Sequence, residues 1–193
     1  VKCDLLVFGS IREMIENTYS MPIVIIKLCK LYYGCIPDKF DENLKNKYFR
    51  IDGMRIINTI WNPFGRASFL SNVISSGIYE WKFKIIKTEK GNIGIGIWND
   101  EVEIEHDKHL NSSYYIGQDQ NTAYVYEGLH GDINQHEGDK HSVWLSYGVK
   151  LKRNDEIIMT LNMHKLTLSF KVNNNNYGIS HHITKGKYRA GIF

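Results

Sequence analysis

The stretch 77–100 constrains the fold of this chain more than any other part of it. In its first half, large apolar side chains alternate with polar ones, which is the period of a strand with one buried face. The apolar positions are Tyr79, Trp81, Phe83 and Ile85. In its second half, isoleucines alternate with Gly94 and Gly96, where the missing side chains let another backbone approach closely. Because six residues join the two halves, the sequence predicts a hairpin in an antiparallel sheet.

Short alternating segments recur through the rest of the chain, separated by turn signals. The dipeptide Asp52-Gly53 predicts a hairpin between 48–53 and 54–60. Further strands are expected at 66–72, 114–117, 122–126, 143–147, 156–161, 166–172 and 187–193, with a long loop at 128–142 and an asparagine-rich turn at 173–176. The sequence therefore predicts an all-β fold, an antiparallel β-sandwich of concanavalin or jelly-roll type over 48–193.

Residues 1–47 show a different period. Ser20 and Pro22 are helix start signals, and apolar residues then recur at near-helical spacing up to Gly34. This pattern predicts a helix of about 12 residues, which is marginal in water by itself and is expected to dock on the sandwich or on a partner. The polar segment 35–47 is interpreted as a linker, so that 1–47 forms a short N-terminal α-helical lead-in.

Composition argues against several classes of partner. The 24 basic and 21 acidic residues leave a net charge of +3, which is too small and too dispersed to indicate a nucleic-acid or membrane partner. The longest apolar run, 23–26, is far shorter than the roughly 20 residues that span a bilayer. All three cysteines lie in the first 35 residues, which favours a reduced, intracellular and cytoplasmic setting. The chain starts without Met and ends on a predicted strand, as expected of a piece of a longer protein.

Catalytic and metal-binding patterns are weak. The histidines fall in polar segments without accompanying cysteines, so we expect solvated loop histidines rather than a metal site. No serine stands in a Gly-x-Ser-x-Gly elbow, and Cys29 and Cys35 lack a catalytic pattern. Gly94 and Gly96 lack the strand-turn-helix context of a phosphate loop. The sequence predicts a protein that is not an enzyme and has no cofactor or metal.

The same residues carry a resemblance to a known family. The segments 77–85 and 94–97 resemble the opening signature of the SPRY domain, a β-sandwich that binds protein ligands, and 114–117, 154–173 and 187–193 resemble its later strands. The resemblance implies that loops at one end of the sandwich grip a peptide or a protein surface. The matching positions are 60–64, 98–100, 126–129 and 142–147. The lead-in helix also resembles a segment found before some SPRY domains.

Aromatic and polar residues in these loops are the candidate ligand-binding residues, because binding residues concentrate on loops of a rigid scaffold. Trp61 and Trp98 are expected to supply apolar contact, while amides and carboxylates fix the orientation of the ligand. The complete set is Trp61, Asn62, Phe64, Trp98, Asn99, Asp100, Tyr126, Glu127, Trp144 and Tyr147.

These observations lead to one hypothesis and two alternatives. The hypothesis is a non-catalytic module that captures a protein or peptide ligand within a larger intracellular protein, as an adaptor or scaffold. The first alternative is a lectin-like, carbohydrate-binding sandwich, because such folds share this strand pattern and also use aromatic residues with Asn and Asp. The second alternative is a purely structural or oligomerising domain.

Overall fold

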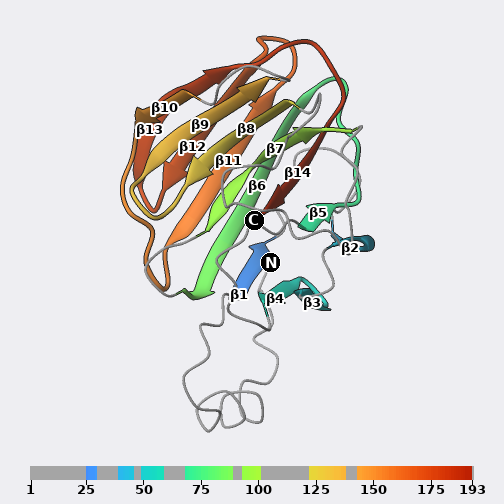
Figure 1. Cartoon of the computed structure of the whole chain (residues 1–193), viewed down its shortest axis with the longest axis vertical. Coiled ribbons are helices and arrows are strands. Elements are labelled where there is room, and N and C mark those ends of the chain that lie inside the picture. Colours follow the sequence, from blue (N-terminus) through green and yellow to red (C-terminus); the bar gives the residue numbers. More distant parts are fainter. Residues whose placement is uncertain are drawn as a thin grey trace, which may run out of the picture.

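The computed structural model describes residues 25–29, 39–45, 49–58, 68–88, 93–100, 122–137 and 143–192. Over these ranges the chain forms fourteen strands in two sheets and contains no helix (Figure 1). All of the strand pairs within the sheets are antiparallel. The predicted antiparallel β-sandwich is therefore confirmed over this part of the chain.

Each sheet has seven strands, whose order in space differs from their order in the sequence. Across sheet A the strands are β13 (Asn175–His182), β12 (Thr167–Val172), β11 (Glu156–Asn162), β6 (Ile78–Lys87), β1 (Ile25–Cys29), β4 (Arg55–Asn58) and β3 (Phe49–Asp52). Across sheet B they are β10 (Val143–Ser146), β9 (Asp132–Glu137), β8 (Thr122–Glu127), β7 (Gly94–Asn99), β14 (Tyr188–Ile192), β5 (Ser68–Leu70) and β2 (Phe40–Lys45). One edge of the sandwich consequently carries β13 and β10 (Figure 1).

The core lies between the sheets, as the alternation predicts. Trp81, Phe83 and Ile85 of β6 are buried, while the residues between them are partly exposed. Ile95 and Ile97 of β7 belong to the same buried cluster. The alternation in the sequence therefore identified the buried face of each of these two strands correctly.

The predicted hairpin between 77–86 and 93–98 is wrong. Strand β6 pairs with β1 and β11 in sheet A, whereas β7 pairs with β8 and β14 in sheet B. Both strands present an apolar face to the core, so they face each other across the interior instead of lying side by side. Alternation reports which face of a strand is buried but does not identify its hydrogen-bonded neighbour.

Three segments predicted as helix, linker or loop contain strands. Ile25–Cys29, inside the predicted helix, is strand β1 between β4 and β6; the rest of that helix lies outside the described residues. Phe40–Lys45, inside the predicted linker, is strand β2, which pairs with β5. Asp132–Glu137, inside the predicted loop, is strand β9, which pairs with β8 and β10. In all three, pairing with neighbouring strands outweighs the local pattern. The proposed division of the chain after residue 47 stays a prediction.

The predicted hairpin at Asp52-Gly53 is confirmed. Strands β3 and β4 pair around this turn, and Gly53 has a φ of +58°, a conformation that favours glycine. No helix among the described residues has the length and apolarity needed to cross a membrane.

Gly96 lies where two strands approach closely. A Cβ at this position would lie 2.2 Å from the main-chain oxygen of Tyr124 and 2.9 Å from the Cα of Val125. Because backbone atoms cannot rotate away, we expect Gly96→Ala to lower the free energy of unfolding by about 1–3 kcal/mol or more. Urea unfolding measures this loss. Gly186→Ala is the control, since its Cβ would come no closer than 3.5 Å to the Tyr188 ring. Equal midpoints for the two variants would contradict the expectation.

Candidate functional site

Apart from Trp144, the described candidate residues of sheet B lie at its two opposite ends. Asn99 is paired with Tyr188 at one end of β7, whereas Glu127 is paired with Gly94 at the other end. Five residue steps along a strand correspond to about 17 Å. These candidates therefore form two groups and not one cluster. The remaining three, Trp61, Asn62 and Phe64, lie outside the described residues.

Trp98 is completely buried, with 0% of its surface exposed. Its ring packs edge-on against Phe69 at a centroid distance of 5.1 Å, in a small cluster that also contains Ala123 and Val125. Trp98 therefore offers no exposed surface on which a ligand could rest.

Asn99 and Asp100 lie at the end of sheet B where β14 begins. The Asp100 carboxylate forms an ion pair with Arg189 and accepts a hydrogen bond from its Nε at 2.6 Å. Arg189 also donates a hydrogen bond to the carbonyl of Ser71 at 2.7 Å. The main-chain N–H of Asp100 donates to Lys187 O. Asp100 is thus engaged in joining three segments of the sandwich.

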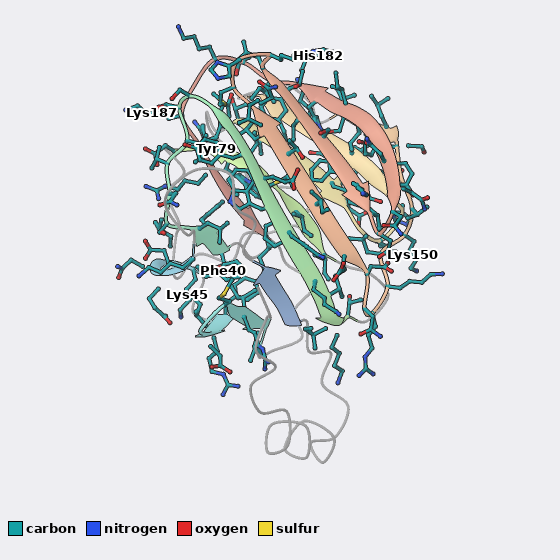
Figure 2. The ribbon with its side chains drawn as sticks, turned by 180° about the vertical axis from the view of Figure 1, so that it is seen from behind. Phe40, Lys45, Tyr79, Lys150, His182 and Lys187 are labelled. Carbon is teal, nitrogen blue, oxygen red and sulfur yellow. The ribbon has the colours of Figure 1, made fainter. Side chains whose placement is uncertain are left out.

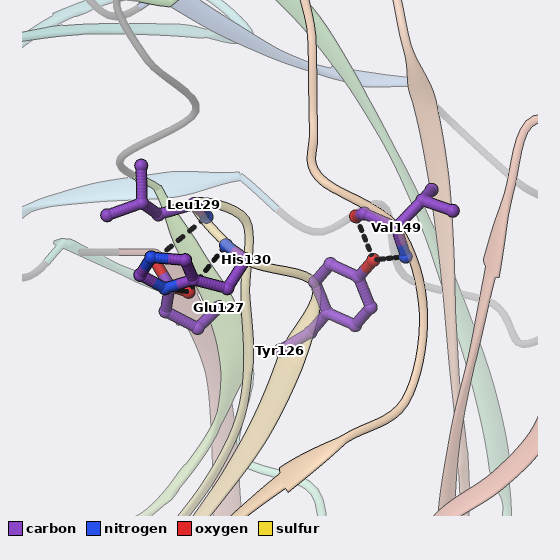
Figure 3. Close-up of polar contacts among 5 residues, drawn as sticks. All are labelled: Tyr126, Glu127, Leu129, His130 and Val149. Atoms are coloured by element: carbon purple, nitrogen blue, oxygen red, sulfur yellow. Dashed lines mark hydrogen bonds and ion pairs between the residues drawn. The ribbon is translucent and has the colours of Figure 1, made fainter.

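Tyr126 anchors the segment that follows β10. Its buried hydroxyl donates to the carbonyl of Val149 and accepts from the N–H of Val149 at 2.8 Å (Figure 3). Burial raises the pKa of Tyr126 to about 12, so the hydroxyl keeps its proton at neutral pH. Both main-chain groups of Val149 are held by this one side chain.

Glu127 organises the turn between β8 and β9. One carboxylate oxygen accepts from the N–H of Leu129 at 2.8 Å, and the other accepts from the N–H of His130 at 3.0 Å (Figure 3). His130 Nδ1 lies 3.4 Å from the same carboxylate. Because Glu127 is buried and its oxygens are occupied within the turn, its observed contacts are structural.

Tyr147 ties the two sheets together at the edge that carries β10 and β13. Its hydroxyl donates to the carbonyl of Gly178 at 2.6 Å and accepts from the N–H of Phe170 at 3.2 Å. Its ring contacts those of Tyr126, Phe170 and Tyr177. Burial raises the pKa of the Tyr147 hydroxyl, which favours its role as a donor.

A row of core residues runs across sheet B and becomes exposed at β10. Paired residues share one face of a sheet, so Ile95, Tyr126, Ile133 and Leu145 lie side by side on the face that looks toward sheet A. The first three are buried, whereas Leu145 is 57% exposed. Val143, two residues earlier on the same face, is 53% exposed. We call Val143 and Leu145, bounded by Tyr147 and Tyr177, the β10 shelf.

Trp144 lies on the opposite face of β10, paired with Asn134, and is 39% exposed. Of the described aromatic candidates, it has the side chain most accessible to a partner. Sequence reasoning missed Val143, Leu145 and Tyr177. The alternation of Val143, Leu145 and Tyr147 in an uncharged predicted strand was the available signal.

His181 is a buried residue of β13, which corrects the expectation that the histidines are solvated in loops. Its Nε2 lies 3.1 Å from the carbonyl oxygen of Asn134 in sheet B, and its Nδ1 lies 2.9 Å from Ser180 Oγ. A carbonyl only accepts, so the proton of the neutral ring lies on Nε2, while the Ser180 hydroxyl donates to the carbonyl of Leu168 at 2.9 Å. This serine–histidine pair is held by a carbonyl and not by a carboxylate. The described residues contain no group of three His, Cys, Asp or Glu that could hold a metal ion.

Comparisons with known proteins agree with this architecture. The SPRY domain of human HERC1 superimposes with a TM-score of 0.59 at 20% identity, over 80% of this chain and 89% of that one. The TRIM65 PSpry domain superimposes with a TM-score of 0.54 at 10% identity, over 81% and 85%. The carbohydrate-binding module CBM66 from Bacillus subtilis reaches only 0.43, at 9% identity over 69% and 75%, and supports no argument. No protein-family model and no curated protein matches the sequence. The fold is SPRY-like.

Proposed function

We propose that this chain, a SPRY-like β-sandwich, is a non-catalytic module inside the cell that captures a peptide or the surface of another protein. Its fold and the sequence resemblance support the class of function. The observation that carries the proposal is the β10 shelf, where the apolar face of sheet B continues beyond the cover of sheet A.

The exposure of β10 is unusual for the edge of a sheet. Edge strands are normally protected by charged side chains, since an apolar edge invites pairing with other chains. Strands β2 and β3, at the far edges of the two sheets, carry such charges. Strand β10 has the sequence Val-Trp-Leu-Ser and carries none. An exposed apolar strand of this kind marks a surface that a partner covers.

Capture by loops at one end of the sandwich was the mechanism expected from the resemblance. Asp100 stands at one end, and Tyr147 with the turn after β8 stands at the other. A single ligand therefore meets one of these groups. We place it at the end with Tyr147, because the β10 shelf opens there and the exposed Val149 extends its apolar surface.

Peptide selection tests this function. A phage library of random 12-residue peptides is selected on the immobilised chain, and the affinity of the enriched peptides is measured by fluorescence polarisation. We expect Leu145→Ser to weaken binding about tenfold, because a well-buried leucine side chain contributes about that factor. Ile78→Ser is the matched control, since Ile78 is also exposed but lies on β6 in sheet A.

Two outcomes would contradict the proposal. Sugars that bind on a glycan array, with no peptide enriched from the library, would favour the lectin-like alternative. A stable oligomer in sedimentation, dissociated by Leu145→Ser, would favour a structural or oligomerising domain.

A further inference from the structure

We infer that the ligand of the β10 shelf is a short, extended and acidic segment of another protein, with apolar side chains placed among its carboxylates. This inference rests on the proposed function and specifies the chemistry of its ligand. Three features of the described residues carry it: the size of the shelf, the closure of the neighbouring strand β13, and the charge around the shelf.

The size of the shelf favours a short segment over a second copy of the chain. A four-residue strand is about 13 Å long, and only two side chains of the shelf are largely open. A stable protein–protein interface buries about 800 Å² on each partner. The shelf provides much less than that, so it is suited to a few apolar side chains of a peptide.

Strand β13 is partly closed to a new neighbour. The carbonyl of Gly178 already accepts from the Tyr147 hydroxyl, and the pairing of β13 with β12 contains two register shifts. Such bulges disturb the regular row of main-chain groups that an added strand needs. Strand β13 is therefore poorly suited to main-chain pairing with the ligand, whose apolar side chains fill the space over Val143 and Leu145.

The segment that follows the shelf carries an excess of positive charge. Residues 150–156 contain the basic residues Lys150, Lys152 and Arg153 and the acidic residues Asp155 and Glu156. Asp155 accepts hydrogen bonds from the Lys152 N–H at 2.7 Å and from Asn173 Nδ2 at 3.1 Å, and Glu156 pairs with Lys82 at 2.6 Å. Both carboxylates are thus already engaged, and the excess positive charge favours a ligand that carries negative charge.

Three exposed cations, Lys150, Lys152 and Arg153, stand at the Tyr147 end of the shelf. Lys150 directly follows Val149, whose main chain is hydrogen-bonded to the buried Tyr126 hydroxyl. Figure 2 shows the Lys150 side chain projecting outward at the edge of the sandwich. Arg153 belongs to the turn that Asp155 joins to Asn173, just before β13 begins. Neither Lys150 nor Arg153 forms an ion pair with a described acidic residue. Asp132 of β9 pairs with Ser146, on the opposite face of sheet B from Leu145.

Three peptide libraries test the inference. Each displays 12-residue peptides with randomised apolar residues at alternate positions; the positions between them are Asp or Glu in the first, Lys or Arg in the second, and Ser or Asn in the third. We expect the acidic library to supply the strongest binders. Their affinity should fall about tenfold with Leu145→Ser and a few-fold with Lys150→Gln plus Arg153→Gln, and it should also weaken as salt is added. Lys165→Gln plus Lys185→Gln is the charge control, because both lysines are exposed and lie outside the Lys150–Arg153 segment.

The outcomes separate this inference from the proposed function. Equal enrichment from all three libraries, or acidic peptides that bind Leu145→Ser as tightly as the wild type, overturns the inference and leaves a protein-binding module. Failure of every library, including the fully random one, overturns the proposed function itself. Circular dichroism and urea unfolding of each variant show that the loss of affinity is not a loss of fold.

Discussion

Trp98→Ala is expected to lower the free energy of unfolding by about 3–5 kcal/mol, the usual cost of removing a large aromatic side chain from a core. The Trp98 side chain is completely buried, and its edge-on contact with Phe69 would be lost together with its packing on Ala123 and Val125. Urea unfolding followed by circular dichroism measures the change. Because the variant is destabilised as a whole, any loss of ligand binding would follow the loss of folded protein.

Trp144→Ala is the matched control for Trp98, since it removes the same side chain from an exposed position. We expect its free energy of unfolding to change by less than about 1 kcal/mol. A Trp98→Ala variant that unfolds at the wild-type urea concentration but has lost ligand binding would support the binding role first predicted for this residue and refute its core role.

His181 should make the fold sensitive to acid. Burial lowers the pKa of this histidine to about 4, whereas its unfolded value is near 6.5. Above pH 6.5 the ring is neutral in both states, and its full contribution to stability is present. As the pH falls from 6.5 to 4, the unfolded state takes up a proton that the folded state does not, which costs about 3 kcal/mol of stability. Below pH 4 this loss is complete.

The neighbouring histidine provides the control for this measurement. His181→Gln should remove the part of the pH dependence between 6.5 and 4, measured as the difference in unfolding free energy from the wild type. His182→Gln should leave the contribution of His181 intact, because His182 is exposed on the same strand (Figure 2). Parallel pH profiles for the wild type and His181→Gln would show that the folded state accommodates the charged ring.

The alternating segments predicted much of the fold because a strand with one buried face has apolar residues at every second position. For β6, the predicted face matches the buried one, and β11 and β12 lie where strands were predicted. The same signal failed for β1 and β9. Ile25 and Ile26 fit a helical stripe and a strand equally well, and the polar sequence of β9 has no apolar alternation. Both strands are defined by their paired neighbours on two sides.

The candidate site was less predictable than the fold. The candidate ligand-binding residues were chosen from predicted strand ends, but Trp98, Tyr126 and Glu127 are buried, and the two ends of β7 separate Asp100 from Glu127. The sequence does not show at which end of the sandwich a given strand end lies. The β10 shelf was not predicted because its exposure depends on how far sheet A extends over sheet B.

By itself, the sequence determined that the chain folds into stacked antiparallel sheets and which side chains β6 and β7 turn inward, because a period of two is a local property of the backbone. Only the tertiary structure decided which strands are neighbours, which aromatic residues are enclosed, and that Val143 and Leu145 are left open. Those outcomes depend on the relative extent of two sheets whose edges are formed by residues far apart in the chain.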